Sequence, residues 1–67
     1  MKIQVNGQPH EFPDAALSVA ELVLRLGLAG KRIAVERNGE VVPKTRHPEA
    51  AVADGDRFEI IVAVGGG

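Results

Sequence analysis

The residues of greatest chemical interest are the three glycines at the end of the sequence, Gly65, Gly66 and Gly67. They directly follow an apolar, strand-like run, and the last of them carries a carboxylate. Residues without a Cβ form the thinnest peptide available, which can enter a channel too narrow for any side chain. Adenylation by ATP would give the poorly electrophilic carboxylate a good leaving group, and a sulfur or nitrogen nucleophile could then attack its carbonyl. We therefore expect the Gly67 carboxylate to be the reacting group, and Gly65 and Gly66 to pass through a narrow channel of a partner.

The terminal glycines also have two other interpretations. A phosphate-binding loop requires a helix after the glycines, whose N-terminus faces the anion, and no helix follows here. A glycine-rich end can also be a frayed terminus with no role. That interpretation stays open from composition alone. Threading is favoured because the glycines follow the strand without a polar linker.

The remaining candidates for chemistry have structural explanations. The only imidazoles, His10 and His47, lie in an expected strand and in a loop, where a lone histidine is usually structural or solvated. Ser18 is explained as a helix N-cap. Asp54 and Asp56 flank Gly55 in a typical turn, without an evident third ligand for a metal. No nucleophile, base and orienting group can be assembled, so we expect neither a metal site nor an enzyme.

Composition bounds the class of protein. A chain of 67 residues is one domain at most. It has no cysteine, which excludes disulfides and fits a reducing compartment. Its net charge of −1 and its two aromatic residues argue against nucleic-acid binding. No signal peptide or apolar run of about 20 residues is present. We expect a soluble cytoplasmic protein that does not bind membranes and is monomeric when free.

The first half of the chain predicts a hairpin and a helix. Residues 1–12 alternate apolar and polar side chains around Asn6-Gly7, the strongest short signal for a hairpin turn. Pro9 places the second strand at a sheet edge. Ser18 and Glu21 form a capping box, and apolar residues then recur with helical spacing over residues 19–26. Gly27 is the expected C-terminal cap.

The second half predicts another hairpin and a long strand. Asn38-Gly39 separates two short apolar runs, and Pro43 ends the second of them. The segment "TRHPEAAVA" has no clear period and is interpreted as a connection with one short helical turn starting at Pro48. The run "DGDRFEIIVAV" is the strongest strand. Within it we expect inward side chains at Phe58, Ile60 and Val62, and outward ones at Glu59, Ile61 and Ala63.

One amphipathic helix must bury its apolar stripe against a sheet. The sequence therefore predicts an α+β fold with the β-grasp layout, a mixed sheet of about five strands packed on one main helix. The last strand, as the most apolar, is expected at the centre and parallel to the first. We expect a β-grasp domain over residues 1–64 and a flexible glycine tail over residues 65–67.

The whole chain resembles the ubiquitin-like β-grasp sulfur carriers, and most closely those of thiamin biosynthesis. The resemblance covers "MKIQVNG", the helix "SVAELVLRLGL", the hairpin "RIAVERNGEVVP" and the end "DGDRFEIIVAVGGG". Each piece alone is common, but the tail, the Asp-Gly-Asp turn and the length are fairly specific together. The family pattern is defined by its last two glycines. Its function therefore carries over to Gly66 and Gly67, while Gly65 departs from the pattern.

The resemblance implies a cycle of activation and sulfur transfer. An adenylating enzyme of the ubiquitin-activating type would convert the Gly67 carboxylate to an acyl adenylate, using ATP and magnesium. Sulfur from a protein persulfide would replace AMP and give a Gly67 thiocarboxylate. A thiazole synthase would accept that sulfur. The protein would thus be a cosubstrate with no bound cofactor.

Apolar residues that alternation places outward form the expected docking face beside the tail: Ile61, Ala63, Ala34 and Val41. Val64, the last residue before the glycines, is added to this partner-binding set. Ordinary surface hydrophobes are the alternative interpretation of the same residues.

Three alternatives to the thiazole pathway stay open. The chain could be the small subunit of molybdopterin synthase, which uses the same thiocarboxylate. It could feed another sulfur pathway or be a protein-conjugating modifier. It could also be a β-grasp binding module whose glycine end is incidental.

Overall fold

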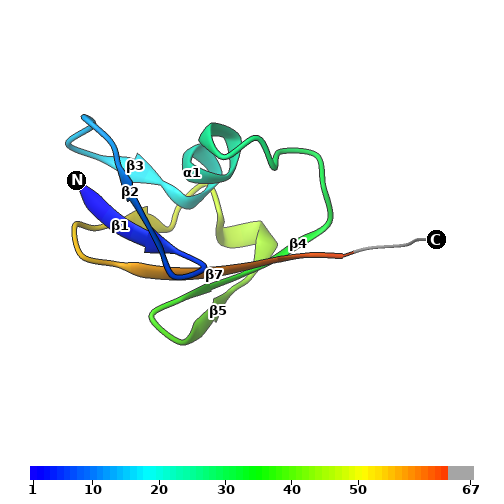
Figure 1. Cartoon of the computed structure of the whole chain (residues 1–67). Helices are drawn as coiled ribbons and strands as arrows, with labels where there is room; N and C mark the ends of the chain where they lie inside the picture. The colour runs from blue at the N-terminus through cyan, green and yellow to red at the C-terminus, as the bar shows by residue number, and fades with distance from the viewer. Residues whose placement is uncertain (64–67) are drawn as a thin grey trace.

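The computed structural model describes residues 1–63, so the predictions for Val64 and for the glycines at 65–67 lie outside the described residues. A five-stranded mixed sheet carries one α-helix on one face, and a second sheet of two short strands lies beside the helix (Figure 1). This confirms the predicted β-grasp arrangement. The elements in chain order are β1 (Lys2–Val5), β2 (Gln8–Glu11), β3 (Leu17–Ser18), α1 (Val19–Arg25), β4 (Ile33–Arg37), β5 (Glu40–Val42), the 3₁₀ helix η1 (Lys44–Arg46), β6 (Ala51–Val52) and β7 (Arg57–Val62).

Both predicted hairpins form around their Asn-Gly pairs. Asn6 and Gly7 have φ values of 51° and 78°, and Asn38 and Gly39 have values of 51° and 88°. Positive φ at both central residues is the requirement of a type I′ turn, which matches the twist of the flanking strands. The registers follow from these turns, with Val5 opposite Gln8 in the first hairpin. Each turn thereby fixes which side chains of its strands face the core.

The helix begins and ends where its caps predict. The Ser18 hydroxyl accepts a hydrogen bond from the Glu21 amide at 3.0 Å, and the Glu21 carboxylate accepts one from the Ser18 amide at 2.9 Å. At the other end Gly27 has a φ of 74°, and the Leu28 amide donates to the Val23 carbonyl at 3.0 Å. This pattern satisfies carbonyls that the last turn leaves without helical partners.

Strand β7 occupies the centre of the sheet, whose order is β2-β1-β7-β4-β5. It runs parallel to β1, as predicted, and antiparallel to β4. Phe58 and Ile60 are buried against the helix side of the core. The prediction for Val62 was wrong, because 38% of this residue is exposed. Val62 lies opposite Ile33, the half-buried first residue of β4, where the sheet extends past the core.

The connection between β5 and β7 differs from the prediction. Its helical turn is a 3₁₀ helix at Lys44–Arg46 and does not start at Pro48. Pro43 has a φ of −58°, and its carbonyl accepts from the Arg46 amide at 2.8 Å, so the proline that ends β5 also starts this turn. The chain then forms β6, an unpredicted strand that pairs with β3 through Leu17 and Val52.

Within residues 1–63, no helix is both long enough and apolar enough to cross a bilayer.

Candidate functional site

The start of β7 is held by a buried carboxylate. Asp56, directly before the strand, is 6% exposed. It accepts hydrogen bonds from Arg37 Nε at 2.7 Å, from Asn38 Nδ2 at 3.0 Å and from the Ala53 amide at 2.7 Å. The ion pair with Arg37 is therefore part of a satisfied network, the condition under which a buried charge is tolerated. The network fixes β7 against the end of β4.

The electrostatics of Asp56 follow from these contacts. Burial of the carboxylate acts to raise its pKa, but the hydrogen bonds from Arg37, the Ala53 amide and Asn38 lower the pKa of Asp56 below its ordinary value overall. The same contact raises the pKa of Arg37. The pair is thus ionised at neutral pH and has a structural role in positioning β7.

The two turn asparagines also hold β7. The Asn6 side chain donates to the Ile60 carbonyl at 3.1 Å and accepts from the Ile60 amide at 2.7 Å. The Asn38 side chain accepts from the Arg57 amide at 2.9 Å. Sequence reasoning assigned these asparagines only to their turns. Their hydrogen bonds to β7 depend on strand pairings across the sheet, which no local pattern reveals.

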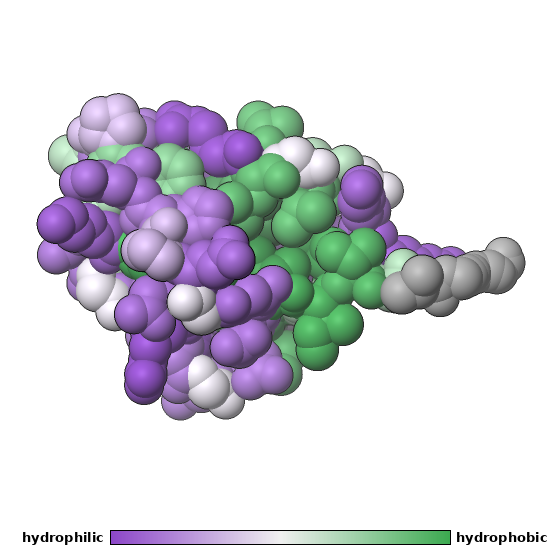
Figure 2. Space-filling model, viewed as in Figure 1, coloured by the Kyte–Doolittle hydropathy of each residue, from purple (hydrophilic) through white to green (hydrophobic). Residues whose placement is uncertain are grey.

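The predicted docking residues gather on the sheet face opposite the helix. Ile61 is 63% exposed and lies directly across from the exposed Ala34. Ala63 follows on the same face of the chain, and Val41 is 70% exposed on β5. Val64, the fifth of these residues, lies outside the described part. Their outward orientation is confirmed for the four described residues, and Figure 2 shows hydrophobic surface concentrated toward the end of the molecule where β7 finishes.

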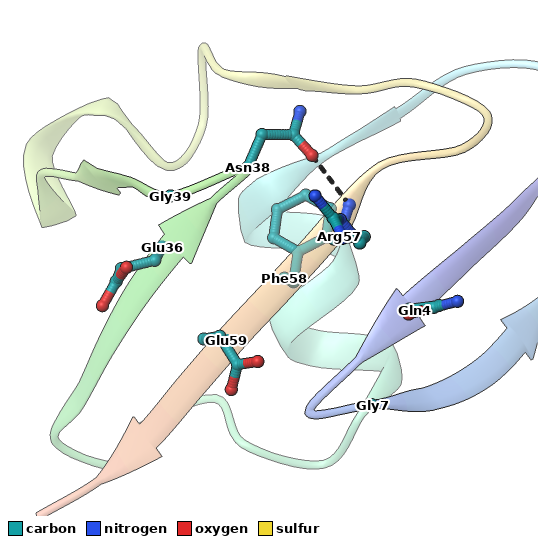
Figure 3. A pocket seen from close by; sticks show the side chains of 8 residues that line it. All are labelled: Gln4, Gly7, Glu36, Asn38, Gly39, Arg57, Phe58 and Glu59. Carbon is teal, nitrogen blue, oxygen red and sulfur yellow. Dashed lines mark hydrogen bonds between the residues drawn. The ribbon is translucent and has the colours of Figure 1, made fainter.

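The other half of the same face is polar. A shallow hollow of about 310 Å³ lies between the two Asn-Gly turns, and its lining includes Gln4, Glu36, Arg57 and Glu59 (Figure 3). Glu36 and Glu59 are directly opposite each other in the β4–β7 pair. Outward side chains of β7 therefore change along the strand from charged, at Arg57 and Glu59, to apolar, at Ile61. An apolar contact surface is available only where the strand approaches its end.

The structure gives His47 and Asp54 structural contacts. His47 is 7% exposed, and its Nε2 donates to the Val42 carbonyl at 3.1 Å, which ties the end of β5 to the following loop. The Asp54 carboxylate accepts from the Lys2 amide at 2.6 Å. His10, in β2, stacks on Phe12, which directly follows that strand, with ring centroids 6.3 Å apart. Across residues 1–63, no three histidine, aspartate or glutamate side chains gather as metal ligands would.

Comparison with known proteins relates this geometry to a family. Residues 3–67 match the model of the ThiS family. The sulfur carrier protein ThiS of Bacillus subtilis is 34% identical over 65 residues, which cover 97% of this chain and 98% of that protein. A crystal structure of a thiamine biosynthesis protein (ThiS) from Geobacter metallireducens matches with a TM-score of 0.85 and 38% identity, covering 100% of both chains.

A longer relative matches as well. A thiazole synthase of Paramagnetospirillum magneticum is 43% identical over all 67 residues of this chain. The chain spans only 20% of the length of that relative. The matches to the Bacillus and Geobacter proteins, in contrast, extend over nearly the full length of both partners. Since the family model covers all but the first two residues, the chain belongs to the ThiS family.

Proposed function

We propose that this chain is a sulfur carrier of thiamin biosynthesis, a protein cosubstrate that partner enzymes act on. The observation that carries the proposal is its full-length match to the Bacillus subtilis sulfur carrier protein ThiS. The match to the family model extends through Gly67 and so includes the terminal glycines. The contacts of Asp54, Asp56 and His47 support a carrier, because each of these side chains stabilises the fold.

The proposed reacting group is the carboxylate of Gly67, with Gly65 and Gly66 as threading residues. Attack of this carboxylate on the α-phosphorus of ATP forms an acyl adenylate and releases pyrophosphate. The terminal sulfur of a persulfide then attacks the carbonyl and displaces AMP, which gives an acyl disulfide. A second thiol forms a disulfide with the donor and releases the Gly67 thiocarboxylate. The glycine Cα leaves the carbonyl open to each nucleophile.

The proposal requires partners that supply the chemistry. An adenylating enzyme of the ubiquitin-activating type binds the ATP and magnesium, and a protein persulfide provides the sulfur. A thiazole synthase is the proposed acceptor, which agrees with the similarity of this chain to a segment of a relative named thiazole synthase. Thiol chemistry of this kind needs a reducing environment, so we place the carrier in the cytoplasm.

The proposed docking face for these partners is the apolar part of the outer sheet surface. It comprises Ile61, Ala63, Ala34 and Val41, with Val64 beyond the described residues. Exposed apolar residues that adjoin one another are more typical of binding surfaces than scattered ones are. Ile61 and Ala34 are direct cross-strand neighbours. A partner that binds here lies beside the end of β7, from which residues 64–67 continue.

Intact mass measurement tests the proposed reaction. The chain ending at Gly67 is incubated with ATP, magnesium, the adenylating enzyme and a persulfide donor. We expect a mass increase equal to the replacement of one oxygen atom by sulfur. A variant lacking Gly67 and a variant with one alanine added after Gly67 should stay unmodified, because the terminal carboxylate is then displaced by one residue from the position in which the adenylating enzyme would activate it.

Two outcomes decide between the classes of function. An unmodified wild-type chain in the presence of enzymes that load another carrier contradicts the proposal. Loading of the alanine-extended variant contradicts the assignment of the reaction to Gly67. If the charged carrier supports molybdopterin formation as the small subunit of molybdopterin synthase and does not deliver sulfur to thiazole synthase, the carrier chemistry stands and the pathway is wrong.

A further inference from the structure

The backbone of β7 directs alternate residues to its two neighbours. The Asn38 amide donates to the Arg57 carbonyl at 2.7 Å, and the Ala63 amide donates to the Arg32 carbonyl at 2.9 Å. The backbone groups of Arg57, the first residue of β7, and of Ala63, directly after the strand, therefore face the β4 side. Because this alternation has a period of two, residues 58, 60 and 62 turn theirs toward the β1 side.

The β1 side of β7 is covered only in part. The ladder with β1 ends at Val5 and Phe58, and the Asn6 amide donates to the Phe58 carbonyl at 2.9 Å. At Ile60 the Asn6 side-chain amide replaces the missing strand residue, since it bonds both the amide and the carbonyl of Ile60. At Val62 the β1–β2 hairpin no longer lies alongside β7, because its chain turns at Asn6 and Gly7. Within residues 1–63, the N–H and C=O of Val62 face an open edge with no paired strand.

The outer edges of the sheet, in contrast, are protected. β2 carries Pro9, which has no N–H to offer to another strand. β5 has only three residues and is followed by Pro43. Short strands and prolines are devices by which proteins keep free edges from pairing. The stretch around the open edge, formed by Ile61 and Val62 at the end of β7 and by the following Ala63, has neither a proline nor a charged side chain.

We infer that this open edge of β7, at Val62, receives an extended segment of the adenylating partner by strand addition. This inference rests on the proposed function and specifies how the carrier is held. The Val62 N–H and C=O provide one donor and one acceptor at strand spacing. Ile61, 63% exposed, and Val62, 38% exposed, offer apolar contacts on the two faces of the added strand. The partner segment is therefore extended and carries apolar side chains where it contacts Ile61 and Val62.

The position of this edge suits an activating complex. The Ala63 amide is bonded to Arg32 on the β4 side, so the backbone at residue 63 is already held on one side. Pairing on the other side at Val62 fixes the direction in which the chain leaves the sheet. Main-chain hydrogen bonds orient a strand with little dependence on its side chains. Such pairing holds the partner segment next to the point from which the residues after 63 continue.

The substitutions Val62→Pro and Val62→Ala separate the backbone contribution from that of the side chain. Proline removes the N–H that faces the open edge, and that N–H bonds no described residue. Alanine keeps the N–H and removes most of the side chain. We expect Val62→Pro to weaken binding to the adenylating enzyme at least tenfold, and Val62→Ala to weaken it only a few-fold. Both free proteins should keep a cooperative unfolding transition, which denaturant titration checks.

Amide exchange of the wild-type protein gives a measurement that does not depend on a variant. In the free carrier, the Val62 amide should exchange much faster than the Ala63 amide, which is bonded to Arg32. In the complex with the adenylating enzyme, the Val62 amide should become protected. Equal loss of binding in the two variants, or a Val62 amide that stays unprotected in the complex, overturns the inference.

The sulfur-loading assay distinguishes this inference from the function on which it rests. If wild type is loaded while Val62→Pro binds as well as Val62→Ala, the edge inference alone fails. If wild type neither binds nor is loaded by enzymes that load another carrier, both proposals fail.

Discussion

A single buried carboxylate, Asp56, connects three parts of the backbone. It accepts hydrogen bonds from the side chains of Arg37 and Asn38 and from the amide of Ala53. These residues lie at the end of β4, in the following turn and after β6. In a domain of this size, a net stability of only a few kcal/mol is expected. The loss of one such network should therefore be measurable.

The pH dependence of stability reports on this carboxylate. The pKa of Asp56 in the folded protein is lowered, whereas an unfolded aspartate has a pKa of about 3.9. A lowered folded-state pKa adds stability that is fully present above the unfolded value and is lost as the pH falls through the folded value. In wild type, we expect the free energy of unfolding to decrease once the pH is lower than about 4. Asp56→Asn should lower it at pH 7 by about 2 kcal/mol and flatten its decline in acid.

The matched control is Asp14→Asn. Asp14 also has a lowered pKa, because Arg25 donates two hydrogen bonds to it at 2.9 and 2.8 Å, but this ion pair is more exposed than that of Asp56. Exposed ion pairs contribute less than buried ones with several hydrogen bonds. Denaturant titrations from pH 7 to acid measure both variants. A larger loss at pH 7 for Asp14→Asn than for Asp56→Asn would contradict the structural role of the Asp56 network.

At the scale of the elements, the capping box of α1 carries a local share of stability. Ser18 and Glu21 satisfy each other's amides at the start of a helix of only seven residues. Ser18→Ala removes an acceptor for one of these amides and should cost about 1 kcal/mol. For a domain of this size, that corresponds to a fall in Tm of about 4–8 °C. Ser18→Thr keeps the hydroxyl and should stay near wild type; equal falls for alanine and threonine would show that the cap is not responsible.

Elements with local signals were predictable from the sequence. The Asn-Gly turns specify their own φ values, and the Ser18–Glu21 pair specifies where α1 begins, so these predictions agree with the structure. The β3–β6 pair was missed because each strand has two residues, too few to show a period, and its partners are far apart in the chain. The helical turn was misplaced because Pro43 starts it before Pro48 is reached.

The candidate site was predictable to the same degree. Alternation along the strands correctly gave outward positions to Ile61, Ala63, Ala34 and Val41. Alternation says nothing about where the core ends, and for this reason Val62 was wrongly expected to be buried. The double hydrogen bond from Asn6 to Ile60 also had no local signal, since it depends on how the first and last strands meet.

At the scale of the whole molecule, two large hydrophobic side chains mark opposite surfaces. Ile61 is 63% exposed on the open face of the sheet, and Leu24 is 65% exposed on the helix. They thus provide a matched pair, similar in exposure and different in location. Ile61→Asp should weaken binding to the adenylating enzyme at least tenfold, about 1.4 kcal/mol. Leu24→Asp should leave binding unchanged, because the helix surface is not part of the proposed docking face.

Calorimetric titration against the adenylating enzyme measures this difference, and thermal unfolding checks that both variants fold. Similar affinities for the two variants would exclude the outer sheet face as the docking face. The Gly67 loading assay is independent of this result, because it follows the reaction and not the surface that binds.

The parallel pairing of β1 with β7 has a consequence for how the chain acquires its structure. Gln4 lies beside Arg57, so the centre of the sheet joins residues more than fifty positions apart. The entropy of closing such a loop is lost before its contacts form, which makes folding slow for topologies of this kind. On the ribosome, the first hairpin and the helix emerge early. β7, which lies between β1 and β4 in the sheet, is the last of the described strands to be synthesised. We therefore expect nascent chains shorter than residue 57 to remain unfolded and sensitive to proteases.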